Sequence, residues 1–284
     1  MFPTSFAYHQ ATSVADAVAA LAGNPEAKVL AGGHSLIPAM KLRLATPGLL
    51  IDLGRVSELK GVSIENGVAT IGAMTTYDEL RFADGVAAAF PIVSDAINVI
   101  GDQQVRAHGT IGGALAHNDP AADMTAVFLV LGGSVQVTGS SGERTVSGED
   151  LFVDLWTTSL EPDEVITRIL IPVPAEGTLT AYKKHAHPAS GYAVVGVAIA
   201  IERANGVVSG ASIVVTGATS KPTHAAAAEA ALIGKKLDDE AIGGAASAAA
   251  VGLEVNGDTY ASEAYRIQLI KVLTKRAIEF AINR

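Results

Sequence analysis

Two pairs of adjacent glycines constrain this chain more than any other feature of its sequence. The first lies in Ala31-Gly32-Gly33-His34-Ser35, between an apolar run typical of a strand and a segment, Leu36–Leu42, typical of a short helix. The second lies in Thr110-Ile111-Gly112-Gly113-Ala114. Glycine allows close approach to a ligand and a positive φ, and N–H groups at a helix start can converge on an anion. We therefore expect two loops that form the walls of one diphosphate cleft; the alternative is two ordinary glycine turns.

Other nucleotide-binding and catalytic patterns are absent from the chain. No two of its 29 glycines are separated by one residue, so the G-x-G-x-x-G signature of a Rossmann domain does not occur. The P-loop pattern G-x-x-x-x-G-K-[ST] is also missing, as are H-E-x-x-H and G-x-S-x-G. The histidines His108, His117, His185 and His187 show no spacing typical of metal ligands. We therefore assign no catalytic residue and no metal site.

Composition and charge narrow the class of protein further. A chain of 284 residues with 49% apolar residues suffices for one large domain or two of moderate size. The net charge of −9 argues against nucleic acid or an anionic membrane as the main partner. Without cysteine, the chain can hold neither a disulfide nor an iron–sulfur cluster. No apolar run has transmembrane length and no signal pattern is present, so we expect a cytoplasmic location.

The apolar pattern predicts alternating strands and helices in the first part of the chain. Thr12-Ser13 can cap a helix from Val14 to Leu21, and strands are expected at Lys28–Ala31 and Leu49–Leu53, which together form a small βαβ-like unit. The further expected elements are a hairpin of Gly61–Ile64 with Val68–Ile71 around Asn66-Gly67, a helix capped by Thr75 or Thr76, a helix from Phe90-Pro91 to Ile100, a helix from Asp119-Pro120 to Leu131 ended by Gly132-Gly133, and a hairpin of Ser134–Thr138 with Glu143–Ser147.

A second domain is expected to follow the proline-containing segment Pro172–Pro174. Three strands are predicted there, at Thr178–Lys184, Val194–Arg203 and Val207–Val215, the last two joined by Asn205-Gly206. Three alanine-rich helices are predicted after them, at His224–Leu232, Glu240–Val251 and Ser262–Ile282. We place the boundary at residue 176, which gives domains 1–176 and 177–284.

The motifs, taken together and in order, resemble the FAD-binding medium subunits of molybdenum hydroxylases, the xanthine dehydrogenase family. The resemblance rests on the two glycine segments with Leu36-Ile37-Pro38, Lys41-Leu42-Arg43, Ile51-Asp52-Leu53, Gln104-Val105-Arg106 and Asp119-Pro120-Ala121-Ala122-Asp123. It covers nearly the whole chain and is greatest for medium subunits of the aerobic carbon monoxide dehydrogenase type. It implies an α+β fold, with a two-subdomain FAD-binding domain of the PCMH or vanillyl-alcohol-oxidase-like type and a C-terminal domain of a three-stranded antiparallel sheet and helices.

The resemblance also implies a set of cofactor-binding residues. Asp123 matches an acidic residue that binds the flavin, although a favourable charge at a helix start is the alternative. Ile166 and Lys183 match positions that line the flavin, and Tyr192 matches an aromatic that covers one face of the isoalloxazine, or else is a core tyrosine. The other residues of the set are Leu30, Ala31, Gly32, Gly33, His34, Ser35, Leu36, Thr110, Ile111, Gly112, Gly113 and Ala114. His34 either binds a phosphate or the flavin edge or caps its own turn, and the Ser35 and Thr110 hydroxyls can donate to the anion.

The function implied by the resemblance is that of one subunit in a larger enzyme. A large subunit with the molybdopterin cofactor oxidises the substrate, a small subunit with [2Fe-2S] clusters relays electrons, and noncovalent FAD in this chain passes them to an acceptor such as a quinone, NAD or oxygen. We expect two copies of a heterotrimer, in the cytoplasm or attached through its partners to the inner face of the membrane. Two alternatives remain, a self-contained FAD oxidase and a non-catalytic flavin-binding module.

Overall fold

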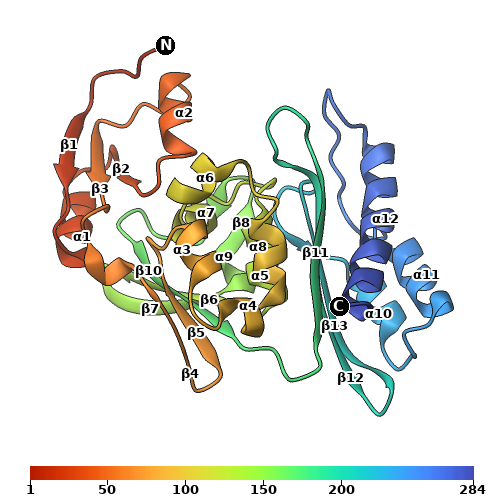
Figure 1. The fold of residues 1–284 in the computed structure, drawn as a ribbon. Coiled ribbons are helices and arrows are strands. Elements are labelled where there is room, and N and C mark those ends of the chain that lie inside the picture. Colours follow the sequence, from red (N-terminus) through yellow and green to blue (C-terminus); the bar gives the residue numbers. More distant parts are fainter.

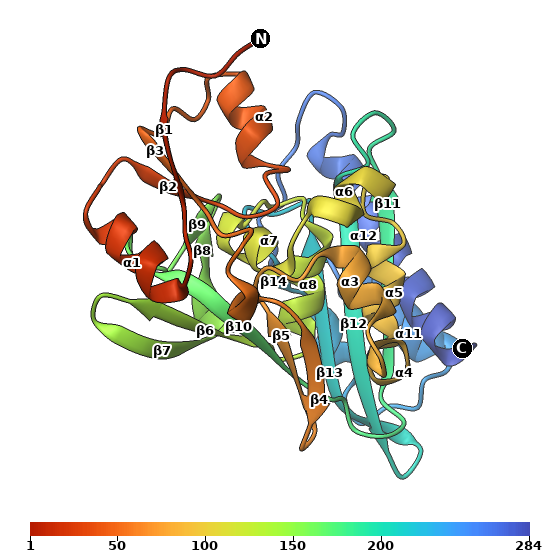
Figure 2. The same ribbon diagram turned by 60° about the vertical axis from the view of Figure 1, so that its left-hand side comes forward.

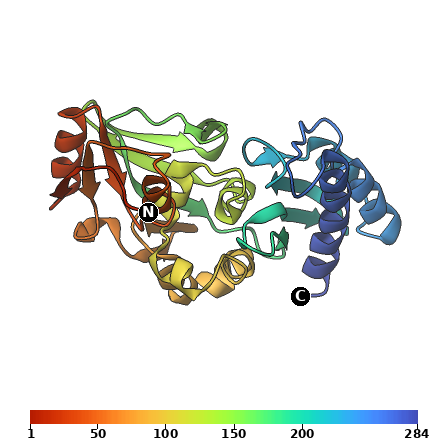
Figure 3. The same cartoon turned by 90° about the horizontal axis from the view of Figure 1, so that it is seen from above.

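The computed structural model describes all 284 residues, which form three larger sheets with their covering helices and one two-stranded sheet. Figure 1 shows a small N-terminal sheet on one side, a larger sheet in the middle and the C-terminal sheet with its helices on the other side. Seen from above, the C-terminal strands and helices form a lobe beside the rest of the chain (Figure 3). The mixed helix and sheet fold agrees with the α+β class expected from the sequence. No helix is both long and apolar enough to cross a membrane.

The N-terminal sheet is parallel and contains the predicted βαβ-like unit. Its strands β1 (Ala7–Gln10), β3 (Leu49–Asp52) and β2 (Ala27–Leu30) lie in that order, and β1 was not predicted. Helix α1 (Val14–Ala22) begins as expected, because the Ser13 side chain accepts a hydrogen bond from the Asp16 N–H. Helix α2 (Leu36–Lys41) follows the first glycine segment. The strand, turn and helix predicted around that segment are therefore confirmed.

The middle sheet is antiparallel, in the order β4-β5-β10-β6-β7. Its first hairpin turns at Asn66 and Gly67, which both have positive φ, as the Asn-Gly pair predicts. The strands are β4 (Val62–Glu65), β5 (Val68–Gly72), β6 (Ser134–Gly139), β7 (Gly142–Ser147) and β10 (Val165–Pro172), with β8 (Phe152–Asp154) and β9 (Thr157–Thr158) forming a separate pair. The helical elements are η1 (Ser57–Leu59), α3 (Tyr77–Phe82), α4 (Val86–Ala89), α5 (Pro91–Ile97), α6 (Gln103–His108), α7 (Ile111–His117), α8 (Asp123–Val130) and α9 (Gly148–Leu151).

Two expectations for the middle part need correction. The second glycine segment is not a loop: Thr110 is the N-cap of α7, and Ile111 to Ala114 form the first turn of that helix. Helix α8 begins at Asp123 rather than at Asp119-Pro120, because the N-cap residue Ala122 is extended and residues 119–122 form a turn. The predicted end of α8 is confirmed, since Gly132 has φ +65° and its N–H donates to the Leu129 carbonyl.

The C-terminal sheet has four antiparallel strands instead of the three expected. They are β11 (Leu179–Ala186), β12 (Ala193–Ala204), β13 (Val207–Thr216) and the short β14 (Thr223–His224), in that order. His224 was predicted to start a helix but pairs with Val214, so that α10 is Ala226–Leu232. The other helices are α11 (Asp239–Ala248) and α12 (Glu263–Ile282).

The C-terminal sheet is covered on both faces. Alternate β12 residues such as Val195 and Val197 pack with α10, α11 and α12 in one core. Tyr182, Ala198 and Val214 face the opposite way and join the core of the middle part. Helices α5 and α8 cover that second face, where Figure 2 shows them beside β11 and β12. Both glycine segments and the connection between β11 and β12 are thereby fixed relative to one another, while the division at residue 176 stays a prediction.

Candidate functional site

The first glycine segment leaves a run of backbone donors unused. It leaves β2 at Ala31, and Gly33 has φ +73°, a conformation that favours glycine. None of the five consecutive N–H groups from Gly32 to Leu36 donates to a backbone carbonyl. Successive free N–H groups of this kind form a concave anion-binding surface. Ser35 precedes α2 without a capping hydrogen bond from its side chain, so its hydroxyl is also available to a ligand.

The second glycine segment uses its donors within the chain. The Ile111 N–H donates to the Thr75 carbonyl at 3.1 Å, and the Gly112 N–H donates to the Ala73 carbonyl at 3.0 Å. The Gly113 N–H donates to Thr110 Oγ1 at 3.2 Å, so this hydroxyl caps the helix. A Cβ atom on Gly112 would lie 2.7 Å from the Ala73 carbonyl oxygen. This segment therefore has no free N–H groups for a ligand. It offers instead the first turn of α7, where Gly112 and Gly113 carry no side chains; we call this the glycine surface of α7.

The structure brings the two glycine segments together. A Cβ atom on Gly32 would lie 2.0 Å from the His108 carbonyl oxygen, and one on Gly113 would lie 3.4 Å from Ala31 Cβ. The rings of His34 and His108 stack with their centroids 5.4 Å apart. His34 Nδ1 also lies 3.1 Å from the Gly32 carbonyl oxygen, which is the turn-capping alternative expected for this residue. The predicted pairing of the segments in one site thus has a direct geometric basis.

The apolar members of the predicted set line the same region. Leu30 ends β2, and its Cδ1 atom would lie 3.3 Å from a Cβ atom on Gly33. Leu36 and Ala114 are half-buried at the starts of α2 and α7.

Asp123 is the centre of a buried polar network. Its carboxylate accepts a hydrogen bond from the Tyr182 hydroxyl at 2.6 Å and pairs with Lys184 Nζ at 2.9 Å. The Asp123 residue is 6% exposed and the Lys184 side chain is 2% exposed. Burial raises the pKa of Asp123, and the charge of Lys184 and the Tyr182 hydrogen bond counteract this rise. The network joins α8 of the middle part to β11 of the C-terminal sheet.

Lys184 also fixes the position of Tyr192. Its Nζ donates to the Gly191 carbonyl at 2.9 Å, in the connection between β11 and β12. Tyr192 is 44% exposed, and its pKa is raised by burial and then by the charge of Asp119, while the neighbouring Ser35 side chain acts to lower it. Tyr192 is therefore close to the first glycine segment, although the two are far apart in sequence.

Two further predicted residues lie on the strands β10 and β11. Ile166 is 5% exposed in β10, opposite Val137, and belongs to the core of the middle part. Lys183 lies on the other face of β11 from Lys184, and its Nζ is 3.1 Å from the centroid of the Phe280 ring in α12. Lys184, which the sequence reasoning missed, is the lysine of β11 that pairs with Asp123, and the predicted place of Lys183 beside the flavin stays a prediction. The alternation of side chains along β11 was the signal available, because Tyr182 and Lys184 must share a face.

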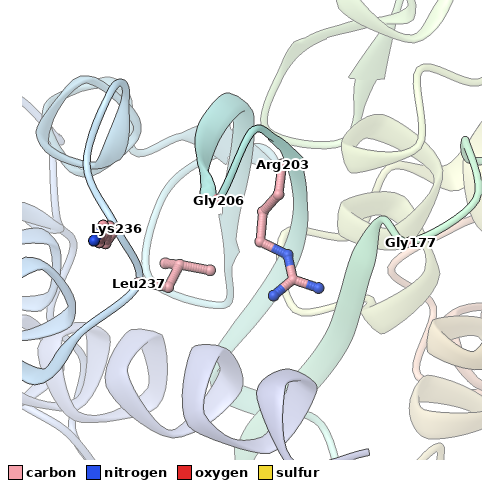
Figure 4. Close-up of a pocket in the computed structure, with 5 residues that line it drawn as sticks. All are labelled: Gly177, Arg203, Gly206, Lys236 and Leu237. Carbon is pink, nitrogen blue, oxygen red and sulfur yellow. The ribbon is translucent and has the colours of Figure 1, made fainter.

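Two pockets of the surface lie apart from these residues. One of 440 Å³ is lined by Gly177, Arg203, Gly206, Lys236 and Leu237, and Figure 4 shows Arg203 extending into it from β12. Another of 930 Å³ lies between β4 and the α3–α4 segment. Neither contains a residue of the predicted set. The site is therefore defined by the free N–H groups, the glycine surface and Tyr192.

The fold and the site define a protein that binds a nucleotide cofactor without a Rossmann domain. The family model described as the FAD binding domain in molybdopterin dehydrogenase matches residues 4–174, and that of the CO dehydrogenase flavoprotein C-terminal domain matches residues 180–281. The chain belongs to this family of FAD-binding molybdenum hydroxylase subunits. FAD is accordingly its cofactor, and the free N–H groups of the first glycine segment fit the diphosphate of that group.

Similar proteins match along their full length. The chain is 39% identical to the carbon monoxide dehydrogenase medium chain of Afipia carboxidovorans, covering 100% of this chain and 99% of the relative. It is 37% identical to the glyceraldehyde dehydrogenase medium chain of Sulfolobus acidocaldarius, covering 98% and 99%. Among solved structures, carbon monoxide dehydrogenase from Hydrogenophaga pseudoflava matches with a TM-score of 0.96 at 39% identity, covering 100% of this chain and 99% of that one.

Proposed function

We propose that this chain is the flavoprotein subunit of a molybdenum hydroxylase of the carbon monoxide dehydrogenase type. The observation that carries the proposal is the run of five free N–H groups from Gly32 to Leu36, placed beside the glycine surface of α7 and close to Tyr192. The similarity to a carbon monoxide dehydrogenase medium chain along the whole sequence supports it. The glyceraldehyde dehydrogenase medium chain is almost as similar to this chain. The substrate of the complex would therefore be decided by the partner subunit that oxidises it.

The residues of the site divide the work of holding FAD. The N–H groups of the first glycine segment and the Ser35 hydroxyl would bind the diphosphate, and the helix dipole of α7 would favour its charge. Tyr192 would cover one face of the isoalloxazine ring, held there by Lys184 through the Gly191 carbonyl. Bound FAD would supply the redox chemistry that collects single electrons and releases them as a pair. The protein contributes binding and orientation of the cofactor.

The electrons would come from partner subunits. The chain contains no cysteine, so the iron–sulfur clusters of such an enzyme must lie in another polypeptide. We propose a large molybdopterin subunit and a small [2Fe-2S] subunit as permanent partners, assembled as two copies of a heterotrimer in the cytoplasm. A quinone, NAD or oxygen would accept the electrons from the flavin. The chain's negative charge disfavours nucleic acid as a further partner.

Titration of the purified full chain with FAD tests the proposal. The account predicts saturable binding that quenches flavin fluorescence, and complete release of the yellow cofactor into the supernatant on acid precipitation, because no residue is proposed to attach it covalently. A folded chain that does not bind FAD would refute the assignment. Yellow protein in the acid pellet would contradict noncovalent binding. Anaerobic addition of carbon monoxide or an aldehyde to the chain with FAD should leave the flavin oxidised, whereas a self-contained oxidase would bleach it.

A further inference from the structure

The connection between β11 and β12 is a closed turn that begins at His187 and ends at Tyr192. The His187 N–H donates to the Tyr192 carbonyl at 2.8 Å, and the Gly191 N–H donates to the His187 carbonyl at 2.8 Å. Gly191 has φ +73°, a conformation that favours glycine. We call residues 187–192 the Tyr192 turn. Because Tyr192 is its last residue, the shape of the turn sets where the tyrosine lies.

The His187 side chain holds this turn from the inside. Its Nδ1 atom accepts hydrogen bonds from the N–H of Ala189 at 3.2 Å and from the N–H of Ser190 at 3.4 Å. Neither of these N–H groups donates to a backbone carbonyl. Since both partners are donors, the contact requires an unprotonated Nδ1. The imidazole therefore supplies the acceptor that the backbone of the turn lacks.

The same imidazole makes a second contact on its outer side. Its ring lies against the ring of Tyr260, in the connection between α11 and α12, with the two centroids 4.3 Å apart. His187 thus offers two separable properties, a hydrogen-bond acceptor inside the turn and a ring that packs outside it. Only the acceptor acts on the segment that carries Tyr192.

Backbone contacts on both sides of Tyr192 place the turn against the middle part of the chain. A Cβ atom on Gly191 would lie 3.5 Å from Gly101 Cα, and the Ala193 N–H donates to the Ala121 carbonyl at 3.4 Å. Tyr192 itself is 44% exposed, although its two neighbours are fixed. The turn therefore presents a partly uncovered tyrosine from a backbone with little freedom to move.

We propose that His187 is a positioning residue for Tyr192. Its Nδ1 atom keeps the turn in the form that places the tyrosine ring over the flavin, and His187 itself does not contact FAD. The inference rests on the proposed function, in which Tyr192 covers one face of the isoalloxazine ring. Loss of the acceptor should loosen the turn and weaken the stacking contact, while the diphosphate contacts of the first glycine segment remain.

Two substitutions in the full chain separate the acceptor from the ring. His187→Phe keeps a ring beside Tyr260 and removes the acceptor. His187→Asn removes the ring, but its Oδ1 lies as many bonds from Cα as the Nδ1 of histidine and can accept from the N–H two residues on. We expect His187→Phe to raise the Kd for FAD about two- to tenfold, the range for one aromatic stacking contact. His187→Asn should restore the wild-type Kd, measured by fluorescence titration.

The Tyr192→Ala background shows whether His187 acts through the tyrosine. There, adding His187→Phe should change the Kd for FAD little, because the stacking contact is already lost. In the chain without FAD, amide exchange measured by NMR at Ala189 and Ser190 should be faster in His187→Phe than in the wild type or in His187→Asn.

Equal FAD affinity of wild type and His187→Phe would overturn the proposal. His187→Asn as weak as His187→Phe would show that the ring contact with Tyr260 is what matters, and an undiminished loss in the Tyr192→Ala background would show that His187 does not act through Tyr192. If the wild-type chain itself does not bind FAD, the proposed function fails. The exchange measurement is independent of FAD, and equal exchange in all three chains would show that Nδ1 does not hold the turn.

Discussion

At the scale of single residues, glycine serves two different purposes in the site. Gly33 has a positive φ and lies among N–H groups that donate to no backbone carbonyl. Gly112 is helical and buried, and a Cβ atom there would lie 2.6 Å from Ala73 Cβ. The first glycine meets a conformational need among the proposed diphosphate contacts, whereas the second allows α7 to pack against the end of β5. Substitutions at the two positions should therefore fail in different ways.

Gly33→Ala should weaken FAD binding, and Gly67→Ala should not. The two glycines have φ of +73° and +78°, so an alanine at either position carries a similar backbone strain of about 1–2 kcal/mol. At Gly33 the Cβ atom would also lie 3.0 Å from Ile37 Cγ1, a flexible side-chain atom. Gly67 lies at a hairpin tip with nothing within 4 Å of a Cβ atom. We expect Kd for FAD to rise on the order of tenfold only in Gly33→Ala, measured by fluorescence titration.

Gly112→Ala completes this comparison, because its methyl group would meet the Ala73 backbone. We expect it to lower the melting temperature of the chain without FAD more than Gly33→Ala does. Unchanged FAD affinity in Gly33→Ala, with the fold intact by circular dichroism, would show that the first segment is an ordinary turn.

At the scale of elements, the sequence predicted structure where local chemistry decides it. Asn66-Gly67 fixed a hairpin through positive φ, and Ser13 fixed the start of α1 through its side chain. The helical state of Gly112-Gly113 was missed because glycine is a poor helix former, and contacts with Thr110 and Ala73 override that preference. Strand β14 was missed because two residues carry no periodic pattern.

The candidate site was predictable to the same extent. Segments 31–35 and 110–114 could be paired from their composition, since each carries its own glycines. The surroundings of Ile166 and Lys183 could not be predicted from the spacing of residues in the sequence, because they depend on which strands pair with β10 and β11. Long-range packing of this kind leaves little trace in one sequence.

One junction between elements gives a pH dependence of stability. His224 Nδ1 lies 2.7 Å from Glu229 Oε1 in α10, and Nε2 lies 2.9 Å from Glu149 Oε1 in α9. The hydrogen bond with Glu229, followed by the charges of both carboxylates, raises the pKa of His224 above its ordinary 6.5, against the opposite effect of burial. The protonated imidazole therefore stabilises the fold fully below pH 6.5, and this contribution is lost as the pH rises through the raised value.

Urea unfolding across this pH range measures the effect. We expect the free energy of unfolding to fall as the pH rises from 6.5, and His224→Gln to remove that part of the fall. His117→Gln is the control, because His117 is exposed on α7 and has no carboxylate partner. The same pH profile in wild type and His224→Gln would contradict this role of the junction.

At the scale of the whole molecule, one sheet connects the cofactor site to the C-terminal helices. The C-terminal sheet packs on α12 with one face and on α5 and α8 with the other. Arg266 of α12 donates to the Val194 carbonyl at 3.0 Å, and Lys184 of β11 joins Asp123 to the Gly191 carbonyl. These contacts fix Tyr192 beside the first glycine segment. We therefore expect the flavin to be held between the first glycine segment and the C-terminal sheet.

The most direct test of this account is an anaerobic reconstitution that follows the visible absorbance of the flavin. The chain with FAD should stay oxidised when carbon monoxide is added, and the flavin should be bleached once molybdopterin and iron–sulfur subunits of a carbon monoxide dehydrogenase from the same source are present. A control mixture without the iron–sulfur subunit should also stay oxidised. If the chain with FAD alone is bleached by the substrate, the flavin is not a relay for partner subunits and the account is wrong.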